Sequence, residues 1–235
     1  MQQRALTGAA DGRLPARRRP AMVDAYLRHR FAWLFGSLLL TLAVGSTLER
    51  LAPRHNVMAL LLAVNLVAAI ASVARERDMR IPLALGGGFV LTRGVLALRG
   101  VPGMLALSEG LWVMAIVLAT VTSVRHAFAR GAVDAERLLA ALDAYLLAGL
   151  LFGVAYAMLD RAWPASFGGA ASQGLDLSHG IYFSFVTIAT LGYGDVIPVS
   201  EPARGLALVE GVSGQMYLAV LVARLVSLYS QQRED

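Results

Sequence analysis

The chain has 235 residues, of which 57% are hydrophobic and only 16% are charged, and its mean hydropathy is +0.61. This composition argues against an ordinary soluble enzyme, in which about 25% of residues are charged, and the lack of cysteine excludes a disulfide scaffold and cysteine-based catalysis or metal sites. The net charge of +5 comes from arginines beside apolar blocks, which is typical of membrane proteins and argues against a nucleic-acid surface.

The N-terminal segment, residues 1–30, is polar and rich in arginine. Residues 1–19 lack a periodic pattern, which is typical of a disordered stretch. Pro20 is suited to the first position of a helix, and the apolar residues after it fall on one face. This segment is therefore either a short helix in the inner membrane interface or an extension of the first span.

Six apolar blocks are long enough to cross a membrane as helices, which takes about 20 residues each. They are 31–48, 57–74, 81–98, 104–124, 138–159 and 205–228. The third block contains three consecutive glycines and Arg93, so its bounds are the least defined. The sequence thus predicts an all-α membrane protein with a four-helix membrane domain at 31–124, a linker at 125–137, a pore domain at 138–228 and a tail at 229–235.

Arginine placement predicts the orientation of these spans. Fifteen arginines lie on the side that carries both termini, five lie on the opposite side, and Arg93 lies within a span. Because cytoplasmic loops carry the excess of basic residues, both termini are expected in the cytoplasm of a multi-pass protein of the plasma (inner) membrane.

The external segment between the fifth and sixth spans begins as a polar loop and then becomes apolar over 181–189. This run is too short to cross a membrane, and Asp176 or Ser178 can cap its start. It predicts a re-entrant half-helix, followed by non-helical backbone at membrane depth. Such backbone is tolerated only where protein buries it or water lines it.

The half-helix ends in residues 187–195, which read Thr-Ile-Ala-Thr-Leu-Gly-Tyr-Gly-Asp. This run resembles the selectivity filter of potassium channels, whose usual form is Thr-Val-Gly-Tyr-Gly-Asp. The preceding half-helix, the flanking spans and the exit through Pro198 match the same family. The resemblance covers the pore half, 138–228, whereas the first four spans share only their number and hydropathy with it.

By this resemblance, backbone carbonyls replace the water around a potassium ion. The implied ion-binding residues are Thr190, Leu191, Gly192, Tyr193 and Gly194, with the carbonyls of the first four and the Thr190 hydroxyl lining the path. The two glycines are expected at positive φ, which they adopt without steric cost. The side chains of Leu191 and Tyr193 are expected to pack behind the filter. One filter supplies a quarter of each ion cage, so a homotetramer in the lipid bilayer is expected, with potassium in the filter and no other cofactor.

Two positions depart from the family pattern. Leu191 replaces the usual valine, and Val186 stands where a bacterial channel has a glutamate that pairs with the filter aspartate. Tyr182 occupies the position of a tryptophan that bonds this aspartate in many members. We therefore expect Asp195, Tyr182 and Thr187 to support the filter.

The sixth span carries the candidate gate. Gly214, with Gly211 before it, lies where family members often have a hinge, and glycine weakens a helix by about 1 kcal/mol relative to alanine. Close packing of helices through small residues is the equal alternative. Below them, Val222 and Val226 lie one turn apart and are candidates for an apolar constriction.

A voltage sensor needs several regularly spaced charges in the fourth span, since each contributes only ~2.3 kcal/mol per 100 mV. The span has no arginine between 111 and 122. We therefore expect no strong voltage gating. The sequence after the sixth span leaves no room for a cytoplasmic ligand-sensing domain, so gating by such a domain is not expected.

Besides Arg224 near the inner end of the sixth span, four charged residues lie within the predicted spans. Arg93 and Glu109 are placed to pair with each other. Asp143 either meets Arg125 or Arg130 or senses protons. Glu210, near the depth of the filter, either braces the filter and the half-helix or makes a simple pair.

An enzyme is the main rival class. The residues Gly192 to Asp195 also fit the Gly-x-Gly-Asp motif of intramembrane aspartyl proteases, with Asp143 as the second aspartate. Asp195, however, precedes a polar exit instead of lying within a span, and the half-helix has no place in that scheme. A transporter or a non-conducting subunit is the other alternative. We therefore predict a potassium-selective channel subunit that is not an enzyme.

Overall fold

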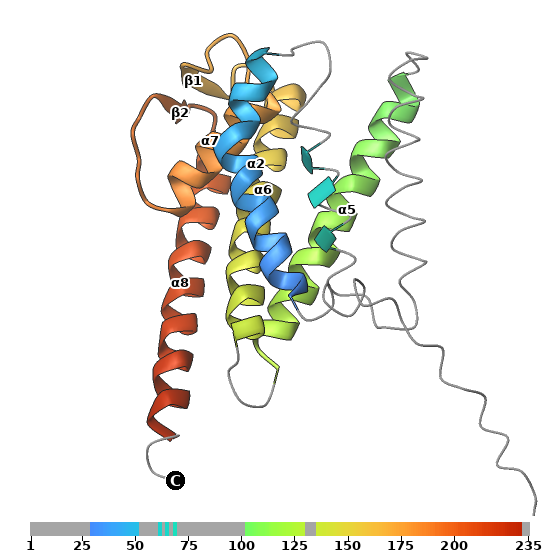
Figure 1. The fold of residues 1–235 in the computed structure, drawn as a ribbon. Coiled ribbons are helices and arrows are strands. Elements are labelled where there is room, and N and C mark those ends of the chain that lie inside the picture. The colour runs from blue at the N-terminus through green and yellow to red at the C-terminus, as the bar shows by residue number, and fades with distance from the viewer. Residues whose placement is uncertain are drawn as a thin grey trace, which may run out of the picture.

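The computed structural model describes residues 29–51, 61, 62, 64, 65, 68, 69, 102–129 and 135–231. Most of this part is helical (Figure 1). The helices are α2 (Arg30–Leu51), α5 (Pro102–Ala127), α6 (Ala135–Ala162), α7 (Leu177–Ile188) and α8 (Glu201–Gln231), and the strands are β1 (Phe167–Gly169) and β2 (Val196–Pro198). The helix proposed after Pro20, the third span with Arg93 and most of the second span lie outside the described residues.

Four of the predicted spans correspond to helices of the structure. They are the first, fourth, fifth and sixth, which are α2, α5, α6 and α8, each extending a few residues past the predicted ends. Two of these helices, α6 and α8, are long and apolar enough to cross a membrane. The architecture is thus mainly helical, as the sequence predicts, while the number of six spans stays a prediction.

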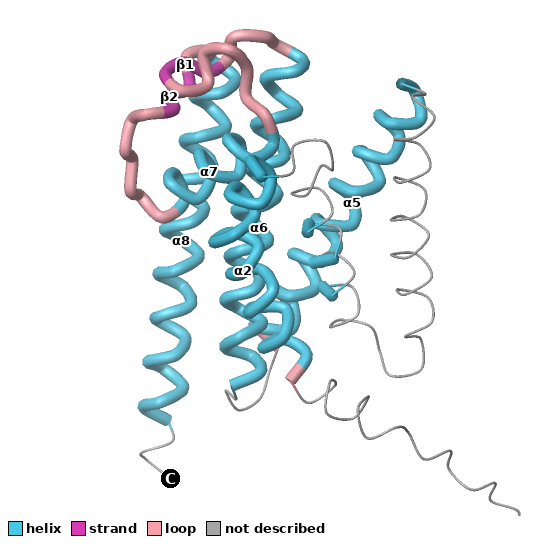
Figure 2. The backbone as a smooth tube through the Cα atoms, turned by 45° about the horizontal axis from the view of Figure 1, so that its top comes forward, coloured by secondary structure: helices cyan, strands magenta, loops and turns pink. Residues whose placement is uncertain are grey.

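Helix α6 is the centre of the described structure, because α2, α5, α7 and α8 all contact it (Figures 1 and 2). Leu34 and Leu38 of α2 and Ile116 of α5 form one apolar cluster with Leu147 and Leu150 of α6. Burial of these side chains stabilises the packing by roughly 1.5–3 kcal/mol each. This helix therefore joins the N-terminal helices to the pore half.

A polar contact holds the described part of the second span against α2. The Asn65 side chain is buried, donates to Thr41 Oγ1 at 2.6 Å and accepts from Ser37 Oγ at 2.6 Å. A buried amide without partners costs free energy, and these two hydroxyls satisfy it on both sides. The asparagine in the middle of the second apolar block thus has a structural role.

The short helix α7 lies very close to α6, and glycines at the contact make this possible. A β-carbon on Gly153 of α6 would lie 2.6 Å from Ile181 Cα, and one on Gly180 of α7 would lie 2.6 Å from the Gly153 carbonyl oxygen. Because both obstacles are backbone atoms, they cannot give way by a side-chain rotation. Glycine at these positions therefore sets the distance between the two helices.

Two short strands, which the all-α prediction leaves out, tie the ends of the external segment together. Strand β1 pairs with β2 in antiparallel register, with Gly168 opposite Ile197. Gly169 has φ +70 and lies against the Asp195 carbonyl, where a β-carbon would collide. Strands of three residues leave no readable alternation in a sequence, which is why this sheet appears only in the structure.

Candidate functional site

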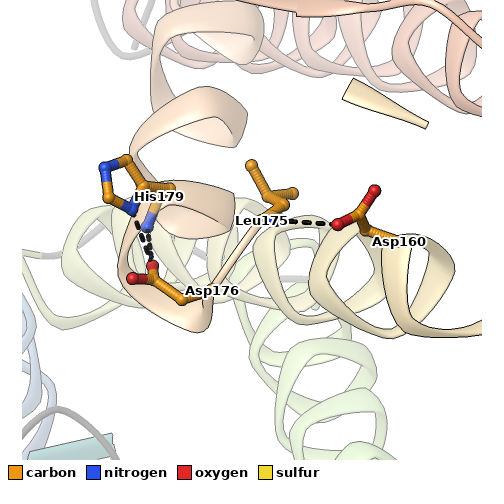
Figure 3. A network of polar contacts seen from close by, with 4 residues as sticks. All are labelled: Asp160, Leu175, Asp176 and His179. Atoms are coloured by element: carbon orange, nitrogen blue, oxygen red, sulfur yellow. Dashed lines mark hydrogen bonds and ion pairs between the residues drawn. The ribbon is translucent and has the colours of Figure 1, made fainter. Parts of the chain in front are cut away.

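The start of α7 is fixed by two aspartates (Figure 3). Of the two candidates for the cap, Asp176 is the N-cap residue, and its side chain accepts a hydrogen bond from the His179 N–H at 2.7 Å. Asp160, at the end of α6, accepts from the Leu175 N–H at 2.7 Å and from the Ser166 N–H at 3.0 Å. One carboxylate thus anchors both ends of the external loop to α6.

The loop after α7 begins with its amide groups held by the helix it leaves. The N–H groups of Leu191 and Gly192 both donate to the Val186 carbonyl, at 2.9 and 3.3 Å, and the Thr190 N–H donates to the Thr187 carbonyl at 2.9 Å. The first amides of the loop are therefore satisfied by carbonyls of α7. In Figure 1 this loop runs along the left edge of the molecule, away from α5.

The backbone of this loop alternates in conformation. Thr190, Gly192 and Gly194 have φ values of +57, +57 and +76, whereas the residues between them do not have positive φ. The prediction of positive φ at the two glycines is confirmed, and Thr190 is an addition that the sequence does not indicate. A threonine with positive φ is unfavourable by about 1–2 kcal/mol, and such strain is typical of functional segments.

The side chains of Leu191 and Tyr193 do not pack within this chain. They are 56% and 67% exposed. The prediction that they lie behind the filter concerns the assembled channel, so it stays a prediction. No element in the described part of the chain covers the outer side of this loop, so their packing requires a surface from elsewhere.

Asp195, at the end of the loop, is held by Tyr182 of α7. The Tyr182 hydroxyl donates to Asp195 Oδ2 at 2.7 Å, which is the contact that the resemblance implies. This hydrogen bond holds the pKa of Asp195 below its usual value and raises the pKa of Tyr182. The Asp195 carbonyl also accepts from the Ala170 N–H at 2.7 Å, so the external loop and the motif are joined directly.

Behind α7, helix α8 supplies Glu210 and Gly214. Glu210 is fully buried and accepts a hydrogen bond from the Tyr156 hydroxyl at 2.6 Å, and it also contacts Ser184 of α7. A β-carbon on Gly214 would lie 2.5 Å from Cγ1 of Ile188, the last residue of α7. The sequence left two alternatives for Gly214, a gating hinge and close packing of helices, and the structure contains a contact for close packing. Gly211 has no such contact within 4 Å.

The inner half of α8 is attached on one face and exposed on another. The Tyr217 hydroxyl donates to the Ala141 carbonyl at 2.7 Å. Arg224 donates to the carbonyls of Ala127 and Ala129, at the end of α5, at 2.8 and 2.7 Å. The candidate gate residues Val222 and Val226 are exposed.

Asp143 makes no ion pair with Arg125, whereas the alternative partner Arg130 lies outside the described residues, so that pairing stays a prediction. Asp143 is fully buried in α6, and within the described ranges neither of its carboxylate oxygens has a hydrogen-bond partner. Arg125 lies in the last turn of α5. The side chain of Glu109 is also outside them, so its pairing with Arg93 stays a prediction.

Several contacts that support α7 were not predicted from the sequence. Ser184 is a single polar residue between two phenylalanines, and Asp160 stands beside Arg161 at the end of an apolar stretch. Tyr145 donates to the Ile188 carbonyl at 3.0 Å from 43 positions away. A lone polar residue in an apolar stretch was the available signal, but its partner is set by the packing of helices that are distant in sequence.

Among the described residues, the motif forms a loop of alternating backbone conformation, and no two carboxylates are shown together as a catalytic pair. Asp195 is joined to the loop that Asp160 holds, whereas Asp143 lies 17 residues earlier on α6, about 25 Å along the helix. Asp195 is thus tied to the loop at the outer end of α6, whereas Asp143 lies toward the other end of this helix, which argues against a proton shared between them. In the part of the chain that the structure describes, no cluster of histidine, aspartate or glutamate side chains could hold a metal ion.

Comparison of the sequence with known proteins finds similarity in the part of the chain that contains this loop. Residues 144–231 match the family model described as ion channel. The inward rectifier potassium channel Kirbac3.1 of Paramagnetospirillum magnetotacticum is 31% identical over 91 residues, which are 37% of this chain and 28% of the relative. Two pore potassium channel c of Oryza sativa subsp. japonica is 30% identical over 83 residues, 35% of this chain and 18% of the relative.

The chain therefore covers less than a third of the length of either relative. The similarity falls on the pore half, where the filter motif lies. The predicted resemblance of this half of the chain to potassium channels is confirmed.

Proposed function

We propose that this chain, whose residues 144–231 match the ion channel family, is the subunit of a potassium-selective channel. The observation that carries the proposal is the alternation of positive φ at Thr190, Gly192 and Gly194. Alternating dihedrals turn successive carbonyls of a loop toward one side, which suits them to replace the water around a potassium ion. The ligands are the carbonyls of residues 190–193 together with the Thr190 hydroxyl.

The proposed assembly is a homotetramer around the filter axis. One loop gives only a quarter of each ion cage, and the exposed Leu191 and Tyr193 need a covering surface that a second copy supplies. Helix α8 has a further apolar face in the open, including Leu208 and Met216, which are 70% and 63% exposed. The C-terminal end of each α7 carries about half a negative charge, so four of them favour a cation on the axis.

Tyr182 and Asp195 support the outer end of the filter. Thr187 accepts from the first amide of the filter, and Glu210 holds the helix that leads into it. At the inner side, Val222 and Val226 form the apolar constriction, because the attached face of α8 turns them away from α5 and α6. Potassium is the transported ion, and no other cofactor is needed for passive conduction.

The proposed setting is the plasma membrane, with six spans per subunit and both termini in the cytoplasm. Conduction depends weakly on voltage, because α5 has no basic residue before Arg125 and His126 in its last turn. A steep voltage response requires several charges that move through the membrane field.

The test uses the full chain, purified in detergent and reconstituted into liposomes. We expect four copies in a native mass measurement, potassium flux that exceeds sodium flux, and currents that change little between positive and negative voltages. A monomer or dimer with full conduction would overturn the assembly. Equal potassium and sodium fluxes would overturn the assignment of the filter.

A further inference from the structure

The carboxyl group of Glu210 lies at the meeting point of the three elements that build the pore half. Glu210 belongs to α8, its partner Tyr156 belongs to α6, and its partner Ser184 belongs to the middle of α7. Glu210 and Ser184 are both fully buried. Both partners are uncharged hydroxyl groups, which is an unusual environment for a carboxylate inside a protein.

A count of hydrogens shows which form of the carboxyl group fits this site. Ser184 Oγ lies 2.6 Å from the Gly149 carbonyl oxygen and is also in hydrogen-bond contact with Glu210 Oε1. A carbonyl oxygen has no hydrogen to donate, and a hydroxyl has one. The two contacts of Ser184 therefore need two hydrogens, of which the serine supplies only one.

The second hydrogen has one available source, the carboxyl group itself. The Tyr156 hydroxyl donates to the other oxygen, Oε2, at 2.6 Å. The atoms then form a continuous chain in which Tyr156 donates to Glu210, Glu210 to Ser184, and Ser184 to the Gly149 carbonyl. An ionised carboxylate would leave one of these close oxygen pairs without a hydrogen.

This chain of hydrogen bonds acts on the filter through α7. Ser184 lies two residues before Val186, whose carbonyl holds the amides of Leu191 and Gly192. On either side of Ser184, α7 also packs closely against Gly153 and Gly214. The position of Ser184 therefore sets the position of the first filter residues.

We propose that Glu210 is a positioning residue for the filter, and that it acts as an uncharged acid that donates to Ser184 while accepting from Tyr156. The inference rests on the proposed function, because its effect is read through ion selectivity. It assigns to a residue of α8 the role of fixing the helix that carries the filter.

Two substitutions at this position separate the two parts of the proposal. In Glu210→Gln, the amide oxygen accepts from Tyr156 and the amide nitrogen donates to Ser184, so the whole chain of hydrogen bonds is kept. In Glu210→Leu, a side chain of similar size keeps none of them. Each variant is prepared as the full chain, its assembly is checked by native mass, and its potassium-to-sodium permeability ratio is measured in liposomes.

We expect Glu210→Gln to keep the permeability ratio within about twofold of the wild type, and Glu210→Leu to lower it by about tenfold or more, because a buried donor and acceptor lose their partners. A selective Glu210→Leu channel would overturn the positioning role. Equal damage in both variants would overturn the uncharged acid, since an ionised Glu210 only accepts. A wild-type channel that does not prefer potassium over sodium would instead overturn the proposed function.

If Glu210→Leu does not assemble, Ser184→Ala decides the positioning role, because it removes the α7 side of the chain and leaves the carboxyl group in place. We expect this variant to assemble and to lower the permeability ratio by several-fold, about half of the logarithmic loss expected for Glu210→Leu. An unchanged ratio in Ser184→Ala tetramers would overturn the proposal.

Discussion

Replacing Gly194 by alanine tests the filter through a single methyl group. Gly194 has φ +76, a conformation that costs a residue with a β-carbon about 1–2 kcal/mol. A β-carbon there would meet no atom of the chain within 4 Å, so the cost is conformational and does not come from a collision. Four copies in a tetramer bring the total to about 4–8 kcal/mol.

This total corresponds to a factor of about a thousand or more in the population of the intact filter, at about 1.4 kcal/mol per factor of ten. Because a β-carbon at Gly194 meets no atom of the spans, we expect their insertion and packing to stay unchanged. We therefore expect Gly194→Ala to assemble as the wild type does, and to lose potassium conduction or its preference over sodium.

The matched control is Gly205→Ala in α8. A β-carbon on this glycine would also meet nothing within 4 Å, but its φ is not in the left-handed region. Alanine there favours the helix by about 1 kcal/mol. We expect an unchanged ratio of potassium to sodium flux in liposomes. A Gly194→Ala channel that conducts and selects like this control would refute the filter assignment.

Asp195→Asn distinguishes the channel from the protease reading. The amide oxygen of asparagine still accepts from Tyr182, and the residue stands outside the carbonyl cages. We therefore expect a smaller loss of flux than in Gly194→Ala. A protease would show the reverse order, because the aspartate would be the catalytic group.

Two further predictions concern the packing and the charges. Gly153→Ala places a methyl group 2.6 Å from Ile181 Cα, and the resulting overpacking costs about 1–3 kcal/mol, which exceeds the gain in helix propensity. We therefore expect the melting temperature in detergent to fall. In the control Gly36→Ala the added methyl group meets open space, so the melting temperature is expected not to fall. Tyr182→Phe removes the main cause of the lowered pKa of Asp195. In the wild type this hydrogen bond contributes stability above the usual aspartate pKa, and the contribution is lost as the pH falls through the lowered pKa. In Tyr182→Phe the contribution is absent, so we expect Asp195 to titrate at a higher pH in an NMR titration. An unchanged midpoint would contradict the pairing of Tyr182 with Asp195.

The sequence by itself determined the features that depend on local backbone chemistry. Length and hydropathy locate α6 and α8, the residue type of Asp176 identifies it as a cap of α7, and the glycines at 192 and 194 indicate positive φ. These features are readable because glycine, capping residues and apolar runs each report on the conformation of their own few residues.

Only the tertiary structure decided which side chains meet across helices. Glu210 finds Tyr156 from 54 positions away, while Asp143, an equally isolated acid in an apolar helix, finds no partner in the described part of the chain. The sequence treats the two alike. The difference arises because contacts between helices depend on how their faces rotate and how closely their glycines let them approach, and both are set by the packing of the whole molecule.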